Sequence, residues 1–373
     1  MQLDYSEKHR ALQSEIRAFI AAHRDKSPKP GGGRRRPDRR MLDWQALLLE
    51  HGYFGRTIPK KYGGYGAPPD VLETAIIAEE FSRAGVSPGI MNQGISMLVP
   101  TLLEEQRERW IGPTIRGETI WCQGYSEPGS GSDLASLRTR AELVDGHFVV
   151  NGQKIWTSSA HFSDMMFLLC RTEPDKPKHE GISYLLLSMQ TPGIEVRPLT
   201  TMTEQATFNE VFFTDVRVPA DQIVMGRGQG WHVANVTLKF ERLLLGDSNK
   251  LMQRLHRIRE MMERTDIDGV RLMDRPEWRD RLLRLQGEVM ASKYHGLRLL
   301  TETARGEDSG VRRMIVKYFG TLLAHRLSSL AVDVMGANGL IYEPSGEGTE
   351  DDDATTWWVD YMYDIGLIIG GGS

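Results

Sequence analysis

The sequence contains little cysteine and no long apolar segment. Cys122 and Cys170 are the only two cysteines among its 373 residues, which excludes a disulfide framework and favours a reducing compartment. No stretch approaches the roughly 18 consecutive apolar residues of a membrane span. The charged, amphipathic residues 1–20 also lack the apolar core of a signal peptide. We therefore expect a cytoplasmic protein without a membrane partner.

The chain also lacks a strong charge of either sign. Its formal net charge is −4, so neither a nucleic-acid-binding surface nor an acidic disordered tail is expected. The one basic run, GGGRRRPDRR at residues 31–40, contains glycine and proline and lies between two helical patterns. A solvated loop is the simpler interpretation of this run, and an anion site is the alternative.

Common motifs for nucleotide, hydrolase and metal chemistry are absent. The glycine- and serine-rich stretch YSEPGSGSD ends in Asp133, where a P-loop needs Lys-Ser or Lys-Thr. It does not open a helix after a buried strand, as a Rossmann fingerprint does. No G-x-S-x-G motif occurs, and the ten histidines show no H-x-x-x-H spacing. We therefore expect no metal site.

Three segments of different periodicity make up the chain. Helical spacing of apolar residues runs to about residue 118, short β-branched and aromatic runs follow, and long amphipathic helical patterns return from residue 226. This order predicts an α+β fold with an N-terminal helical domain (1–118), a middle antiparallel β-domain (119–225) and a C-terminal helical bundle (226–373). No βαβ alternation is present, which excludes a doubly wound sheet. Leu12, Ile16, Phe19 and Ile20 recur at helical spacing, which predicts one apolar face of a helix.

Pairs in which aspartate, asparagine or proline precedes glycine divide the middle segment into strands. Asp145–Gly146, Asn151–Gly152 and Pro192–Gly193 each separate two apolar runs. Such pairs are typical of hairpins and tight turns. We therefore expect a turn at each of the three.

Several motifs, taken in order, resemble the acyl-CoA dehydrogenase family. They are EPGSGSD at 127–133, NGQKIWTS at 151–158, FTDVRVP at 213–219 and VMGANG at 334–339. The last is similar to the segment with which that family reaches FAD from a neighbouring subunit. The resemblance extends over almost the whole chain and implies a C-terminal four-helix bundle and FAD as cofactor.

The residues in these motifs suit a flavin. Serine hydroxyls and backbone amides can approach the edge of the ring closely. Taken alone, Trp156 is more simply a core residue of the β-domain, and the serines are turn formers. The resemblance instead implies that Trp156 lies against the flavin ring, with Ser158 near its N5 atom. The implied FAD-binding residues are Tyr125, Ser126, Gly131, Ser132, Trp156, Ser158, Gly336 and Gly339.

The implied reaction needs a carboxylate that removes the proton α to a thioester carbonyl. Family members carry it in a C-terminal E-G-T segment or on the first long helix after the β-domain, just before an arginine. The first position aligns with Gly371, which has no acid. The second is Glu241, which we expect to be the base; a surface acid in an i,i+4 pair is the alternative. Residues expected to contact acyl-CoA are Ser132, Leu238 and Arg242. The inward stripe of this helix is expected to be Val233, Val236, Phe240 and Leu243.

Two features depart from the family pattern. No clean copy of its R-x-x-F-G segment is present, and Asp333 stands where a glutamine often contacts FAD. We expect an FAD-dependent acyl-CoA dehydrogenase that forms a homodimer or homotetramer and passes electrons to electron-transferring flavoprotein. The alternatives are an oxygen-reactive relative (acyl-CoA oxidase or flavin monooxygenase) and a subunit of a hetero-oligomeric dehydrogenase.

Overall fold

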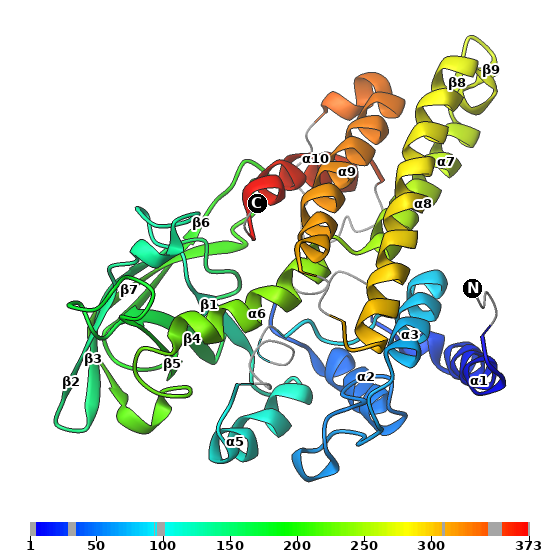
Figure 1. Cartoon of the computed structure of the whole chain (residues 1–373). Helices are drawn as coiled ribbons and strands as arrows, with labels where there is room; N and C mark the ends of the chain where they lie inside the picture. Colours follow the sequence, from blue (N-terminus) through cyan, green and yellow to red (C-terminus); the bar gives the residue numbers. More distant parts are fainter. Residues whose placement is uncertain are drawn as a thin grey trace. The chain divides into compact units, whose positions relative to one another are not determined.

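The computed structural model describes residues 5–28, 35–92, 94, 101–307, 310–341 and 353–371, excluding the helix side chains of 239–245 and 353–356. The chain folds into two compact units (Figure 1). The first comprises Met1–Pro69, Ile76–Thr201 and Gln205–Phe240, and the second comprises Asp70–Ala75, Met202–Glu204 and Glu241–Ser373.

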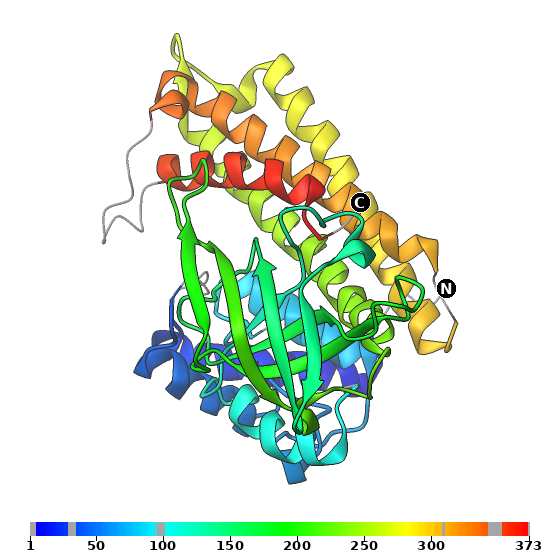
Figure 2. The same ribbon diagram turned by 90° about the vertical axis from the view of Figure 1, so that its left-hand side faces the viewer.

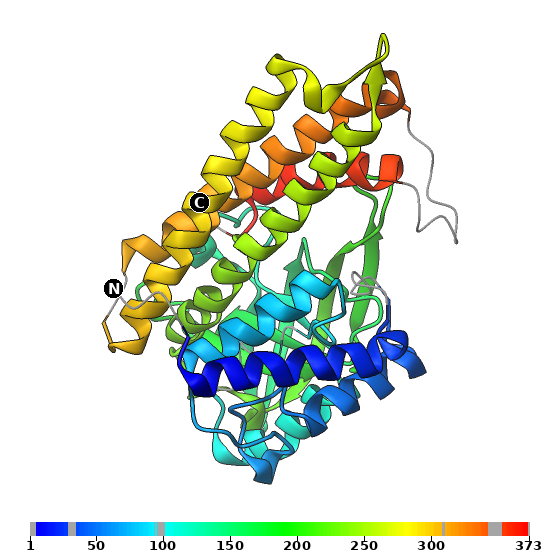
Figure 3. The same cartoon turned by 90° about the vertical axis from the view of Figure 1, so that its right-hand side faces the viewer.

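The N-terminal part of the chain is helical, as predicted (Figure 3). Its helices are α1 (Glu7–His23), α2 (Arg39–Glu50), α3 (Val71–Ala84) and α5 (Glu104–Ile115). Side-chain oxygens of Ser6 and Asp38 accept backbone amides in the first turns of α1 and α2, which satisfies groups that a helix end leaves unpaired. The four residues predicted to form one apolar face of a helix lie in α1, are buried and share one apolar cluster with Trp44, Leu48 and Phe81.

A seven-stranded sheet follows these helices in the first unit (Figure 2). Its strands are β1 (Trp121–Gly124), β2 (Arg140–Val144), β3 (His147–Lys154), β4 (Met165–Arg171), β5 (Ile182–Ser188), β6 (Ile194–Leu199) and β7 (Phe208–Pro219). The hydrogen-bonded order is β1-β4-β2-β3-β7-β6, and β5 pairs with β4. Pairing is antiparallel as predicted, except that β4 runs parallel to β1 and to the first residue of β2.

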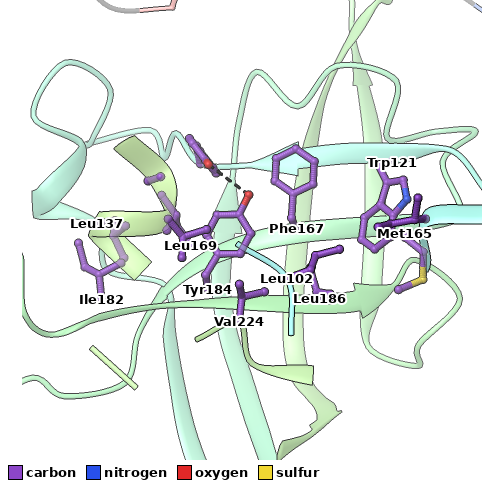
Figure 4. Close-up of a cluster of buried hydrophobic side chains, with 14 of the residues drawn as sticks. Leu102, Trp121, Leu137, Met165, Phe167, Leu169, Ile182, Tyr184, Leu186 and Val224 are labelled. Atoms are coloured by element: carbon purple, nitrogen blue, oxygen red, sulfur yellow. Dashed lines mark hydrogen bonds between the residues drawn. The ribbon is translucent and has the colours of Figure 1, made fainter. Parts of the chain in front are cut away.

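Both faces of β4 and β5 are buried, which explains their nearly unbroken apolar sequences. Alternate residues of β4 enter two cores: Phe167 faces the first and Leu168 the second. The first core, shown in Figure 4, also contains residues of α5 and Val233 of helix α6 (Gly230–Leu245). The second core collects side chains of β3 and β7 with those of β4 and β5, so the sheet curves around it.

The three predicted turns have different outcomes. Asp145 and Gly146 form the two-residue hairpin between β2 and β3, both with positive φ. Pro192–Gly193 lies in the turn before β6. The prediction for Asn151–Gly152 is wrong, because this pair lies inside β3 at a bulge where the register with β7 shifts. A Cβ on Gly152 would lie 2.6 Å from Thr139 Oγ1, so glycine is required there by close packing.

Within its described residues, the second unit is a helical bundle. Four long helices follow the end of α6: α7 (Ser248–Arg264), α8 (Pro276–Ala304), α9 (Val311–Met335) and α10 (Asp353–Ile369). The short strands β8 (Asp266–Ile267) and β9 (Val270–Arg271) form a hairpin between α7 and α8. Helix α9 packs against the other three, and their apolar side chains share one core. No helix in the described parts of the chain has the length and apolar character needed to cross a membrane.

Buried polar contacts attach α10 to the bundle. Arg254 of α7 donates to Asp364 Oδ2 at 2.6 Å, and Ser328 of α9 donates to the same oxygen at 2.8 Å. Lys317 of α9, which is 2% exposed, donates to the Ile368 carbonyl at the end of α10. A cation at a helix C-terminus is favourable, so these contacts fix both the position and the end of α10.

The predicted inward stripe of α6 is wrong at Val236, which is only half-buried. The buried side chains are instead Val233, Ala234 and Thr237. Phe240 and Leu243, the rest of that stripe, lie outside the described side chains. Small residues make up much of the buried face because α6 lies close to β5: a Cβ on Gly230 would lie 2.5 Å from the Ser183 backbone.

Candidate functional site

A buried ion pair joins the two best-matched motif segments, 127–133 and 151–158. Lys154 ends strand β3, and its Nζ donates to Glu127 Oε1 at 2.8 Å and to the Tyr125 carbonyl at 2.9 Å. The Lys154 side chain is fully buried, and Glu127 is 8% exposed. The Glu127 amide also donates to the Ser130 carbonyl, and the Glu127 carbonyl accepts the reciprocal bond, which closes a tight turn. The glycine- and serine-rich loop is therefore anchored to the end of β3.

Backbone amides complete the surroundings of Glu127. The amides of Arg138 and Thr139 donate to its carboxylate at 2.6 and 2.9 Å. Burial raises the pKa of Glu127, but the Lys154 charge and these hydrogen bonds lower it more, so the net pKa lies below the ordinary value. Burial lowers the pKa of Lys154, and the Glu127 charge opposes that change. Glu127 is therefore a carboxylate whose charge is balanced by Lys154 and whose oxygens are hydrogen-bonded. It holds the loop in place and is not suited to act as a proton-accepting base.

Trp156 follows this anchor in a backbone conformation that bulky residues rarely adopt. Its φ is 60°, in the left-handed region, and its side chain is 57% exposed. The Ile155 amide donates to the Ser126 carbonyl at 2.9 Å, and the Thr157 amide donates to the Asn209 carbonyl at 3.0 Å. Firmly held backbone thus presents a large flat side chain outward. Strain of this kind is typical of binding sites.

Hydroxyl groups near these segments have no partner in the part of the chain that the structure describes. Ser126 and Ser158 are half-buried and Ser132 is exposed. Thr157 is fully buried, and its Oγ1 lacks a partner among the described residues. A Cβ on Gly131 would meet nothing within 4 Å. An exposed indole, unpaired hydroxyls and an open glycine fit the flat ring and polar chain of a flavin.

Tyr125 is arranged differently from its neighbours in the loop. Its side chain is 3% exposed and belongs to the first core. Its hydroxyl lies 2.5 Å from Thr237 Oγ1 of α6 and 3.2 Å from the Tyr184 hydroxyl of β5. Because the ring is turned into the core, a flavin contact at this position would use main-chain atoms. The side chain instead connects the loop to α6.

The other end of the loop is held by exposed contacts. Asp133 accepts a hydrogen bond from Ser136 at 2.5 Å and pairs with Lys178 at 2.9 Å. The Ser136 bond, followed by the Lys178 contacts, holds the pKa of Asp133 below its usual value. Arg171 donates to the carbonyls of Ala135 and Leu137. Both ends of the loop are therefore fixed, while Gly131 and Ser132 between them are exposed.

Helix α6 carries the residues predicted for the acyl-CoA. Leu238 is partly buried against the first core. Glu241 and Arg242 continue the same helix, but their side chains lie outside the described ones. Their roles as base and substrate contact remain predictions.

The predicted glycines of the second unit lie in the turn Gly336–Leu340, which ends α9. Gly336 has φ 58° and faces open space. A Cβ on Gly339 would lie 2.5 Å from the Val332 carbonyl oxygen, so packing within the chain requires that glycine. Asp333 is hydrogen-bonded to Arg281 of α8. The FAD contacts of Gly336 and Gly339 remain predictions.

Glu127 and Lys154 were not among the residues predicted for the site. The available signal was a lysine inside the pattern VVNGQKIW, where the alternation of β3 places its side chain in the interior. A lysine is almost never fully buried unless it is paired. A buried acid within reach was therefore to be expected, and Glu127 of the other motif supplies it.

Comparisons with known proteins cover nearly the whole chain. Family models described as acyl-CoA dehydrogenase N-terminal, middle and C-terminal domain match residues 6–118, 122–216 and 228–366. The chain is 37% identical over 340 residues to acyl-CoA dehydrogenase IpdE1 of Mycobacterium tuberculosis, covering 88% of this chain and 83% of that protein. It is 31% identical to acyl-CoA dehydrogenase FadE29 of the same organism, covering 100% and 95%.

Two solved structures extend the likeness to the fold. One is titled Tcur3481-Tcur3483 steroid ACAD and has a TM-score of 0.82 at 26% identity, covering 100% of this chain and 95% of that one. The other is the ChsE4-ChsE5 complex from Mycobacterium tuberculosis, with a TM-score of 0.81 at 27% identity and the same coverage.

Proposed function

The chain belongs to the acyl-CoA dehydrogenase family and is an oxidoreductase; from this premise we propose how it works. It binds FAD and converts an acyl-CoA thioester to the trans-2-enoyl-CoA, and electron-transferring flavoprotein takes up the electrons. The observation that carries the proposal is the buried Lys154–Glu127 pair, which anchors the serine-rich loop beside a strained, exposed Trp156.

The chain's own residues bind and orient the cofactor. Trp156 covers one face of the flavin ring, and Ser126 and Ser158 offer hydroxyls to its polar edge. Gly131 and Ser132 leave room for the phosphates and offer a hydrogen bond to them or to the thioester. Gly336 and Gly339 face the FAD of another subunit. When bound, FAD supplies the hydride acceptor of the reaction.

Glu241 is the proposed base. It accepts the proton from the carbon α to the thioester carbonyl, a weakly acidic position that requires a desolvated carboxylate. Leu238 and Arg242 contact the acyl-CoA on either side of it along α6. The support is positional: Gly371 has no acid where relatives carry the alternative base, and Glu241 precedes an arginine on the first helix after the β-domain.

The Glu241→Gln variant tests this assignment. Glutamine keeps the shape of the side chain and removes its basicity, so FAD and acyl-CoA should still bind. Anaerobic flavin reduction by acyl-CoA in a stopped-flow instrument should slow about 10²- to 10⁴-fold. Reduction at the wild-type rate would place the base elsewhere. Slow reoxidation of the reduced protein in air, with fast reoxidation by electron-transferring flavoprotein, separates a dehydrogenase from an oxidase or monooxygenase.

We propose a bulky, ring-bearing acyl group as the substrate class. The support is the similar solved structure whose title names a steroid ACAD. A panel of CoA thioesters of linear, branched and steroid side-chain acids tests this proposal. Higher kcat/KM for linear thioesters than for the ring-bearing ones would contradict it.

A second candidate is that the chain is one subunit of a hetero-oligomeric dehydrogenase. An apolar stripe on α9 is exposed at helical spacing: Val311 (75%), Met314 (45%), Ile315 (46%), Tyr318 (55%) and Phe319 (37%). A stripe of this kind is typical of a protein interface. The cross-subunit FAD motif R-x-x-F-G is absent, and both solved structures above are titled with two protein names.

Light scattering combined with flavin content separates the two assemblies. A homo-oligomer that holds one FAD per chain supports the first candidate. A chain that binds FAD only when a second, similar chain is co-expressed supports the second. The division into three domains at residues 118 and 225, and the cytoplasmic location, remain predictions.

A further inference from the structure

Three buried hydroxyls connect the flavin-binding loop to helix α6 inside an otherwise apolar core. Tyr125 lies in the loop, Tyr184 in β5 and Thr237 in α6, and their exposed fractions are 3%, 0% and 1%. The Tyr125 hydroxyl is 2.5 Å from Thr237 Oγ1 and 3.2 Å from the Tyr184 hydroxyl. Figure 4 shows Tyr184 among the apolar side chains of this core, with a hydrogen bond at its hydroxyl.

The Thr237 hydroxyl also contacts the main chain of its own helix. Thr237 Oγ1 lies 2.8 Å from the Ala234 carbonyl, which can only accept. The Tyr125 hydroxyl donates to the Tyr184 hydroxyl of β5. Through Tyr125 and Thr237, the loop is therefore connected to the backbone of α6 within the core.

The Tyr125 main chain is held as firmly as its hydroxyl. Its carbonyl accepts from Lys154 Nζ at 2.9 Å, and the next carbonyl, of Ser126, accepts from the Ile155 amide at 2.9 Å. One residue therefore joins the loop, the end of β3 and α6. The packing of the Tyr125 ring does not depend on its hydroxyl. The ring makes edge contacts with Phe167 and Tyr184, and a phenylalanine ring at position 125 could make the same contacts.

We propose that Tyr125 and Thr237 are positioning residues for the dehydrogenation, an inference that rests on the proposed function. Their hydrogen bond fixes the rotation of α6 about its axis relative to the flavin-binding loop. Glu241 follows Thr237 by four residues, and residues at this spacing share a face of a helix. Holding Thr237 therefore fixes the rotation of the helix face that also carries position 241.

Variants that remove one hydroxyl at a time test the proposal. Tyr125→Phe and Thr237→Val delete the bond, Thr237→Ser keeps it, and Tyr184→Phe removes only the outer hydroxyl. Three quantities are measured for each: the FAD dissociation constant by flavin fluorescence, and kcat per bound FAD and KM with acyl-CoA. Far-UV circular dichroism checks that each variant is folded.

The expected pattern separates a positioning role from a structural one. Tyr125→Phe and Thr237→Val should each weaken FAD binding about 2- to 10-fold, as for one hydrogen bond. The double variant should bind FAD no more weakly than the worse single one, because both lose the same bond. We expect kcat to fall about tenfold or more through misplacement of the base, with little change in KM. Thr237→Ser and Tyr184→Phe should resemble the wild type.

Three results would overturn the proposal. The first is multiplied effects on FAD binding in the double variant. The second is an unchanged kcat per bound FAD in Tyr125→Phe, which would leave the hydroxyl a stabilising role only. The third is equal behaviour of Tyr125→Phe and Tyr184→Phe. The wild-type protein distinguishes the failure of this proposal from the failure of the proposed function. If the wild type binds FAD and is reduced by acyl-CoA, the proposed function stands even when the positioning roles are refuted. If the wild type binds no FAD, the proposed function and the positioning roles are both refuted.

Discussion

Replacing Lys154 by methionine removes the cation that anchors the glycine- and serine-rich loop at residues 125–133. Methionine fills similar volume, but Glu127 then keeps the two amide donors of Arg138 and Thr139 without a cation, and the bond from Lys154 Nζ to the Tyr125 carbonyl is lost. Because Lys154 is fully buried and Glu127 is 8% exposed, the loss leaves an uncompensated buried charge. Breaking such a pair from one side costs about 3–5 kcal/mol.

Urea denaturation followed by circular dichroism measures this loss. With a slope of about 3 kcal/mol per molar urea, the midpoint of Lys154→Met should fall by roughly 1–2 M. Flavin content after purification should fall as well, because the loop is no longer held. The double variant Glu127→Gln with Lys154→Met should lie closer to the wild type than Lys154→Met alone, since no buried charge remains.

Lys178 offers a matched control, because it pairs with Asp133 at the other end of the same loop. Its ion pair with Asp133 has the same kind of partners, but the two side chains are 51% and 61% exposed. Exposed pairs contribute little because water and salt screen them, so Lys178→Met should leave the midpoint almost unchanged. Equal midpoints for the Lys154 and Lys178 variants would refute the reasoning that burial makes the first pair critical.

Three further predictions follow from the same geometry. Trp156→Ala should weaken FAD binding by about 1–3 kcal/mol, the range for loss of an aromatic stacking contact, whereas Ser132→Ala should cost about 1 kcal/mol; fluorescence titration with FAD measures both, and equal effects would contradict the roles given to them. Burial raises the pKa of the Cys122 and Cys170 thiols to about 12, so neither should react with a thiol reagent at pH 8 until the protein unfolds; fast reaction of the folded protein would show that they are accessible. The pKa of Glu127 is lowered on folding, so the stability that wild type has over Glu127→Gln should be fully present above about pH 4.5, the ordinary glutamate value, and should be lost as pH falls through the lower folded pKa; a difference that grows on acidification would have the wrong sign.

Periodicity predicted the fold well where apolar residues mark the buried face. Leu12, Ile16, Phe19 and Ile20 follow a strict helical repeat and are all buried. Helix α6 shows why the same argument failed elsewhere. Its buried face includes Gly230, which lies too close to Ser183 of β5 for a Cβ, and the small residue Ala234. A prediction based on hydrophobicity favours large apolar residues over glycine and alanine. It therefore assigned Val236 wrongly to the buried face of α6.

An Asp-Gly or Asn-Gly pair is also ambiguous as a signal for a turn. Asp145–Gly146 forms the predicted hairpin because both residues need positive φ. In Asn151–Gly152 the glycine is needed instead because Thr139 lies too close for a Cβ. A turn and a close packing contact both select glycine, and only the pairing of strands distinguishes them.

The candidate site was predictable only in part. Trp156 and the serines lie in recognisable motifs, so the sequence pointed to them directly. The interior position of Lys154 indicated that it needs an acidic partner, but it did not identify Glu127, 27 residues earlier in the chain, as that partner. The Tyr125–Thr237 contact is harder still, since it joins residues more than a hundred positions apart through one hydroxyl.

The burial of β4 and β5 on both faces makes the chain prone to aggregate before it is folded. Residues 165–170, MMFLLC, form a six-residue apolar window with no charge and no proline, which is a composition typical of aggregation-prone segments. In the folded protein every one of these side chains is buried, but an unfolded chain exposes them until the neighbouring strands have formed.

The residues on either side of this window, Asp164 and Arg171, are charged, and such residues oppose association of unfolded chains. In the folded protein both make hydrogen bonds: Asp164 accepts the Ile120 amide, and Arg171 donates to the Ala135 and Leu137 carbonyls just after the glycine- and serine-rich loop. Neutralising either charge should therefore lower the soluble yield during expression more than it lowers the stability of the protein that does fold.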